Sequence, residues 1–163
     1  MKAFSILLAA GLIAGCNPVA NMNAGEDRIE KFQAAYSRGD DDTMWEMAGK
    51  EWREVSTRED FDRLVTTLES RLGPIKGTER GGFNVNSTPM GTTTVVQMTT
   101  EFAQGKGTET YTFLGNGDDM RLVGWNVNSD RLLVTPEEID QLENNAPDED
   151  RPESEADMDM PAE

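Results

Sequence analysis

The strongest helix signal in the chain lies at residues 56–74, which read STREDFDRLVTTLESRLGP. Ser56 and Glu59 have the spacing of a capping box, in which the first side chain caps the helix and the second bonds back to the cap. Behind them, apolar residues recur on one helical face, at Phe61, Leu64, Val65, Leu68 and Leu72. Gly73 and Pro74 end the pattern, because glycine favours a helix C-terminus and proline cannot continue a helix. The stretch predicts an amphipathic helix with one buried face.

After this helix the apolar period becomes two, which is typical of β-strands. The pattern predicts four strands, at residues 77–87, 94–102, 108–114 and 120–128. Short turns separate them, at residues 89–91, 105–107 and 115–119. Neighbouring strands joined by short turns form an antiparallel meander.

Two helical patterns precede residue 56. Apolar residues at helical spacing occupy 26–38, and Gly39 follows as a stop. The three aspartates at 40–42 are placed to cap a second, shorter helix that carries Trp45, which is a commoner use of such a run than a metal site. Helices followed by a meander predict an α+β domain over 26–143, with N-terminal helices packed on a curved antiparallel sheet of about four strands.

The first sixteen residues have the pattern of an exported lipoprotein precursor. Lys2 supplies a positive charge, residues 3–13 form an apolar run too short to span a bilayer, and residues 13–16 read Ile-Ala-Gly-Cys. This ending resembles a bacterial lipobox, in which a cysteine after small residues is diacylated and becomes the new N-terminus. We therefore expect a signal peptide over 1–15 and a lipid on Cys16 that anchors the protein in a membrane. An ordinary secretory signal with a chance cysteine is the alternative.

The residues after the cysteine bear on where the protein resides. Asn17 stands where an aspartate would be the signal for retention in the inner membrane. The prediction is therefore a lipid-anchored protein of the cell envelope, on the outer membrane and facing the periplasm. Small and polar residues follow, and they predict a tether over residues 16–25.

Composition excludes several classes of function. With 31 acidic and 15 basic residues the net charge is −16, which argues against nucleic acid as a partner. The absence of histidine and the single cysteine exclude histidine-dependent triads, an intrachain disulfide and multi-cysteine zinc sites, so no metal or cofactor is expected. Residues 136–163 hold 12 acidic residues and one basic residue, a net charge of −11. Thr135 is placed to cap a short helix, and residues 144–163 predict a disordered acidic tail.

The order of helices and strands looks like the cone fold of nuclear transport factor 2-like or cystatin-like domains. More specifically, residues 32–128 resemble a bacterial family catalogued as domain of unknown function 4019. The resemblance rests on Trp45, the run 68–73, Arg80, Phe102 with Glu109-Thr110, and Gly124-Trp125. The chain departs from that family at Phe61, where tryptophan is more frequent, and in its acidic tail. The resemblance implies a cone fold and an envelope address. It does not indicate an activity, because the activity of that family is unknown.

Five residues are candidates for a pocket or an ion pair: Trp45, Arg71, Arg80, Glu109 and Trp125. The tryptophans could stack on a ligand in the mouth of the cone, although packing is their commoner role. The arginines could receive an anionic ligand. We predict instead that Arg80 pairs with Glu109 across the sheet, because buried charges need partners.

The predicted function is a non-catalytic envelope lipoprotein whose domain binds a small ligand or a partner protein, with the oligomeric state left open and a dimer as one option. A structural or assembly role, through the sheet face or the acidic tail, is one alternative. A carboxylate-dependent enzyme is another, because the cone fold hosts enzymes that combine a carboxylate base with tyrosine and acid donors. Here the only tyrosines are Tyr36 and Tyr111, and no acid is clearly embedded in an apolar strand face beside them. A deep apolar pocket would favour a ligand or an enzyme, and a filled cone with an exposed apolar sheet face would favour a partner.

Overall fold

The computed structural model describes residues 18–135, 138 and 141. The chain divides into two units, Met1–Leu132 and Leu133–Glu163. The described part of this unit begins with four α-helices: α1 (Pro18–Ser37), α2 (Asp41–Met47), α3 (Lys50–Val55) and α4 (Arg58–Leu72). Four strands follow: β1 (Ile75–Thr88), β2 (Gly91–Phe102), β3 (Gly105–Leu114) and β4 (Arg121–Asn128). Two short 3-10 helices flank β4: η1 (Gly117–Asp119) and η2 (Asp130–Leu132).

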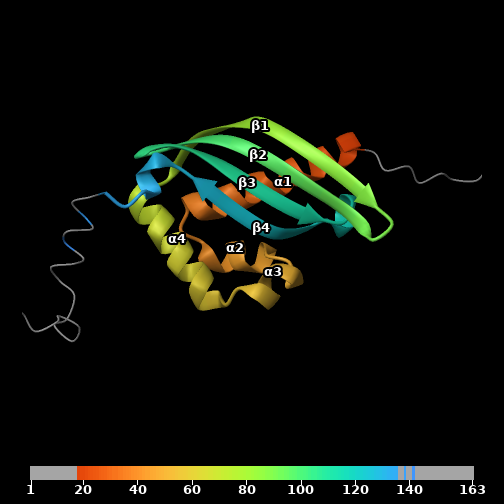
Figure 1. Cartoon of the computed structure of the whole chain (residues 1–163), viewed down its shortest axis with the longest axis horizontal. Coiled ribbons are helices and arrows are strands. Elements are labelled where there is room, and N and C mark those ends of the chain that lie inside the picture. Colours follow the sequence, from red (N-terminus) through yellow and green to blue (C-terminus); the bar gives the residue numbers. More distant parts are fainter. Residues whose placement is uncertain (1–17, 136–137, 139–140, 142–163) are drawn as a thin grey trace, which may run out of the picture. The chain divides into compact units, whose positions relative to one another are not determined.

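The four strands form one antiparallel sheet in the order β1-β2-β3-β4, with α1 across its inner face and α2 to α4 beside β4 (Figure 1). Alternate residues of β2 are buried beneath the helices, from Thr92 to Phe102, while those between them face outward. The helices-then-meander prediction of an α+β fold is confirmed. The Pro89-Met90 turn is confirmed as well, since Thr88 pairs with Gly91.

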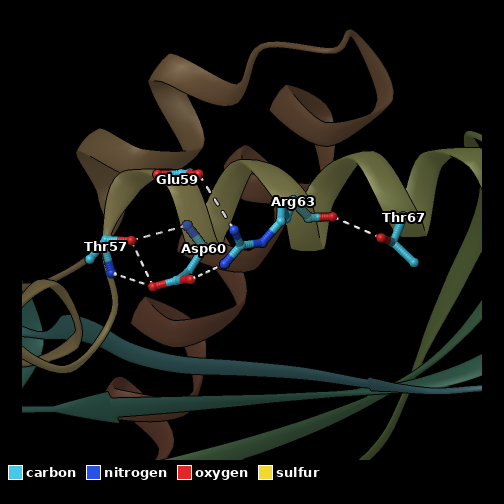
Figure 2. Close-up of polar contacts among 5 residues, drawn as sticks. All are labelled: Thr57, Glu59, Asp60, Arg63 and Thr67. Carbon is cyan, nitrogen blue, oxygen red and sulfur yellow. Dashed lines mark hydrogen bonds and ion pairs between the residues drawn. The ribbon is translucent and has the colours of Figure 1, made fainter. Parts of the chain in front are cut away.

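The capping box of α4 lies one residue later than predicted. Figure 2 shows Thr57, not Ser56, as the cap: its hydroxyl oxygen accepts the backbone N–H of Asp60 at 3.1 Å, and its own N–H donates to the Asp60 carboxylate at 3.2 Å. Ser56 is already used as the C-cap of α3. Glu59 instead pairs with Arg63 one turn further along the helix. The predicted stripe is buried at four of its five positions: Phe61, Val65, Leu68 and Leu72.

Helix α1 begins at Pro18 rather than at residue 26, so most of the expected tether forms its first turns. Proline suits a first helical position, where its missing N–H has no partner to lose. Asn21 and Gly25 are poor helix formers, yet both are buried by tertiary contacts. The Asn21 side chain donates to Asn116 at 2.7 Å and accepts the N–H of Gly117 at 3.2 Å. These contacts override the weak local preference, and residues 16 and 17 lie outside the described residues.

The connection between β2 and β3 is also shorter than predicted. The turn is Ala103-Gln104, and residues 105–107 belong to β3 instead of forming the turn. The N–H of Ala103 donates to the carbonyl of Pro74, and that of Gln104 to the carbonyl of Leu72, both at 2.9 Å. The turn is therefore fixed to the C-terminal end of α4.

Helix α3 was not predicted, and the segment before it closes the far edge of the sheet. Ala48 forms a parallel bridge with Leu122 of β4, and the N–H of Gly49 donates to the Leu122 carbonyl at 2.6 Å. The predicted role of Asp40 is confirmed, since its carboxylate caps α2 by accepting the N–H of Thr43 at 3.1 Å.

Aromatic side chains fill the space between the helices and the sheet. The ring of Phe32 on α1 meets the ring of Trp125 at 5.0 Å and that of Tyr111 at 5.9 Å, both edge to face. Tyr36 packs in the same way against Phe102 at 6.2 Å. The space between the helices and the sheet is thus occupied by packed rings, which is the arrangement that aromatic pairs favour.

Candidate functional site

A fully buried carboxylate lies at the centre of the inner sheet face. Glu109 on β3 is 0% exposed. Its Oε2 accepts the Gln33 side-chain amide at 2.6 Å and the Thr100 hydroxyl at 2.5 Å. Its Oε1 accepts the Tyr111 hydroxyl at 2.6 Å and the Trp125 indole N–H at 3.0 Å. Four donors therefore occupy the two oxygens, and they replace the hydration that the group loses on burial.

The donors come from α1 and from three strands, and a fifth group joins the network to β1. The Gln33 amide also reaches the hydroxyl of Thr78 on β1 at 3.4 Å, and that hydroxyl lies 3.2 Å from the Thr100 hydroxyl. Within residues 18–135, no lysine or arginine contacts the Glu109 carboxylate. The network connects α1 to all four strands through uncharged donors alone.

Burial also holds the tyrosines of this region in their protonated form. It raises the pKa of Tyr111 well above its ordinary value, and the neighbouring Glu109 charge raises it further. Burial likewise raises the pKa of Tyr36, with smaller contributions from Glu69 and Glu109. The Tyr36 hydroxyl donates to the carbonyl of Gly73 at 3.2 Å. Tyr111 therefore acts as a hydrogen-bond donor to Glu109 and not as a second anion.

The predicted ion pair between Arg80 and Glu109 is wrong. Arg80 lies opposite Met98, which lies opposite Glu109, so strand β2 separates the two residues by about 9–10 Å of sheet. The Arg80 guanidinium instead pairs with Glu26 on α1 at 2.6 Å, at a site where both side chains keep a third or more of their surface exposed. The charge partner of Arg80 is a surface carboxylate.

The other candidates divide between packing and the network. The ring of Trp45 packs on the ring of Phe61 at a centroid distance of 5.3 Å. The Arg53 guanidinium lies 5.8 Å from the centroid of the Trp45 ring. Arg71 is half-buried and donates to the carbonyl of Arg131 at 3.5 Å. Of the five candidates, the structure brings together only Glu109 and Trp125.

Sequence reasoning missed three of the donors, Gln33, Thr100 and Tyr111. The expectation that no acid lies in an apolar strand face beside a tyrosine is also wrong. One signal was available: Glu109, Tyr111 and Phe113 occupy alternate positions of one strand and therefore share a face. An acid in that series indicates a buried carboxylate. Nothing comparable distinguishes Gln33 or Thr100 from other polar residues.

One surface hollow is lined in part by Trp125. Its volume is about 200 Å³, and it is lined by Leu64, Thr67, Leu68, Trp125, Asn126, Val127 and Leu132. Trp125 is 8% exposed and contributes to the hollow, while its indole N–H bonds to the carboxylate within. Glu109 itself does not line the hollow. The indole of Trp125 therefore separates the carboxylate from this hollow.

The outer face of the sheet is polar rather than apolar. Most outward positions of β2 and β3 carry polar side chains, among them Thr93, Gln97, Thr99, Thr108, Thr110 and Thr112, and the apolar exceptions are Val95 and Leu114. Threonine suits an exposed strand because its branched side chain packs well on a pleated surface. These strands therefore do not present the exposed apolar sheet face that would have indicated a partner protein.

Comparison of the chain with known protein families, with curated proteins and with solved structures found no match. None of the described helices is both long and apolar enough to cross a membrane. Among the same residues, no group of three or more metal-binding side chains lies together.

Proposed function

We propose that this protein is a lipid-anchored protein of the bacterial cell envelope, facing the periplasm, that acts as a non-catalytic module for a partner protein. The anchor is argued from Cys16 and the small residues before it. Asn17 in place of aspartate favours the outer membrane over the inner one. The resemblance to the domain of unknown function 4019 family supports the same envelope address.

The observation that carries the choice of a partner over a small ligand is the filled interior. Small-molecule sites are concave spaces of roughly 300–1,000 Å³ lined mostly by apolar groups. Here the hollow beside Trp125 measures about 200 Å³, and the carboxylate behind it has all its hydrogen bonds satisfied. A module with a filled interior has to bind through its surface.

A carboxylate-dependent enzyme is the second candidate, because Glu109 and Tyr111 lie within hydrogen-bond distance of each other, at 2.6 Å. Such an enzyme would need the Trp125 ring to leave its place so that a substrate could reach the carboxylate. A general base must also be within reach of the proton it removes. Glu109 meets only protein donors in this arrangement, which supports a structural role.

The membrane anchor is tested by Cys16→Ser. The variant should lose palmitate labelling and remain as an uncleaved or soluble precursor, because stable anchoring takes two or more acyl chains. Asn17→Ser is the matched control, and it should be labelled and recovered with membranes like the wild type. Equal membrane recovery of the Cys16→Ser variant and the wild type would exclude the lipoprotein proposal.

The filled interior is tested by titrating the folded protein with the apolar dye 1-anilinonaphthalene-8-sulfonate. The proposal predicts no saturable rise in dye fluorescence and no change in Tm. Trp125→Ala, which opens a path from the hollow to Glu109, is the positive control and should bind the dye. Saturable binding by the wild type, accompanied by a raised Tm, would favour a small ligand or a substrate instead.

A further inference from the structure

The two ends of the sheet differ in character, and one of them adjoins the proposed anchor. The N-terminal end of α1, the β1–β2 hairpin and η1 lie together at one end of the sheet (Figure 1). Asn21 of α1 bonds to Asn116 and Gly117 in the loop of η1, and the N–H of Gly115 donates to the carbonyl of Thr92 beside the hairpin turn at 2.9 Å. We call this region the hairpin end.

Exposed apolar side chains gather at the hairpin end. Residues 18–132 have five exposed large apolar side chains, and two of them are here: Val19 (55% exposed) and Met90 (99%). A third, Phe83 (46%), lies on β1 five residues before the end of the strand. Phe83 lies opposite Val96, over which α1 packs at Gly25, so Phe83 faces the side of the sheet that carries α1. Met90 is at the tip of the β1–β2 turn.

The hairpin is also free of charge. Residues 81–100 contain no acidic or basic residue, in a chain of which 28% is charged. Arg80, which precedes this segment, is neutralised by its pair with Glu26. An apolar side chain at the tip and a hairpin with no charge to desolvate are the properties of a segment that enters the headgroup region of a bilayer. The charges of the hairpin end lie outside the hairpin, at the exposed Asp118 and Asp119 of η1.

The length of chain between the anchor and the fold brings this end to the membrane. Two peptide links separate Cys16 from Pro18, where α1 begins, and they span at most about 7.6 Å. The headgroup layer on each side of a bilayer is roughly 5–8 Å thick. An acylated Cys16 therefore cannot hold α1 further from the membrane than about the depth of that layer.

We propose that the hairpin end lies against a zwitterionic phospholipid surface, with Met90 among the headgroups. The inference rests on the proposed lipid anchor and adds an orientation to it. The net charge of −16 favours a zwitterionic surface over an anionic one. The domain then stands on the membrane by this end, with the opposite end of the sheet turned to the periplasm.

The test uses the mature acylated full-length protein in phosphatidylcholine vesicles. Because Cys16 is the only cysteine and carries the lipid, Met90→Cys introduces the single free thiol, to which an environment-sensitive nitrobenzoxadiazole label is attached. Lys106→Cys is the matched control, an exposed position at the β2–β3 end of the sheet. The two sites are separated by the length of β2, whose 12 residues span about 36–40 Å.

We expect a blue shift of the label at position 90 on binding to vesicles, and quenching by spin labels placed on the lipid acyl chains near the headgroups. The label at position 106 should show neither effect. If both labels remain water-like while the protein stays on the vesicles, the orientation is wrong and the anchor stands. If the acylated wild type fails to bind vesicles, the anchor and the orientation fall together.

Discussion

Removing the Glu109 carboxylate should destabilise the domain by leaving its donors without an acceptor. In Glu109→Leu, the two N–H donors, the Trp125 indole and the Gln33 amide, lose their partner, whereas the Thr100 hydroxyl keeps the Thr78 hydroxyl as a neighbour at 3.2 Å. Each stranded buried donor costs about 1–3 kcal/mol, so two cost about 2–6 kcal/mol. Part of this cost is offset, because the variant no longer has to remove the Glu109 carboxylate from water. We expect the free energy of unfolding to fall by about 2–4 kcal/mol.

A double-mutant cycle isolates the contact with Trp125. In the wild type, Trp125→Phe removes a bond to the carboxylate, which is worth about 1.5–3 kcal/mol. In the Glu109→Leu background the same change removes a stranded donor, so it should cost much less. The expected coupling is about 1–3 kcal/mol, within the range measured for residues in one hydrogen-bond network.

The free energy of unfolding is measured by urea denaturation followed by far-UV circular dichroism, which does not depend on the replaced tryptophan. Glu101→Leu is the control, because Glu101 is an exposed acid on the outward face of β2, and it should change stability by at most about 0.5 kcal/mol. A loss below about 1 kcal/mol for Glu109→Leu would refute the reasoning. Strict additivity in the cycle would refute the contact with Trp125.

Three further changes have defined outcomes in the same urea assay. Thr57→Ala removes the side-chain cap of α4 and should cost about 1 kcal/mol. Burial and the Asp62 charge raise the pKa of the Asp41 carboxyl in the folded protein. The native state therefore keeps the carboxyl proton to a higher pH than the unfolded chain does, and the free energy of unfolding falls as the pH rises. Asp41→Asn should therefore stabilise the protein near pH 7 and have no such effect at about pH 3, where the Asp41 carboxyl is protonated in both the folded and the unfolded state. An equal gain in the free energy of unfolding at both pH values would contradict this. Arg80→Met breaks only a surface pair and should cost about 0–1 kcal/mol, additively with Glu109→Leu.

The parts of the fold that could be predicted are those whose signal is local. The stripe of α4 and the stop at Gly73 depend on residues close together in the chain, and Gly73 adopts the left-handed φ of 70° that glycine favours. The alternation of β2 likewise reports its own buried face. The start of α1 was missed because Asn21 and Gly25 form helix only when η1 and the sheet are in place.

The candidate site was predicted in part, and the error has a physical cause. Glu109 and Trp125 were both among the five candidates, but the hydrogen bond between them was not predicted. The partner of Glu109 was sought among charges, and Arg80 was chosen although β2 lies between its strand and that of Glu109. The structure satisfies the carboxylate with uncharged donors, one of which, Gln33, lies on a helix 76 positions away in the sequence. No charge pattern identifies such a donor.

The link from Gln33 to Glu109 has a consequence for the order of folding. Before α1 docks, the carboxylate on β3 keeps its water, and docking exchanges that water for the Gln33 amide in a single step. The two residues are 76 positions apart, so this contact closes late, after the strands have paired. Weakening it, as in Gln33→Leu, should raise the unfolding rate and leave the folding rate nearly unchanged. We therefore expect α1 to dock last, although it precedes the other described helices and strands in the sequence, and we expect the Gln33–Glu109 hydrogen bond to lengthen the lifetime of the native state.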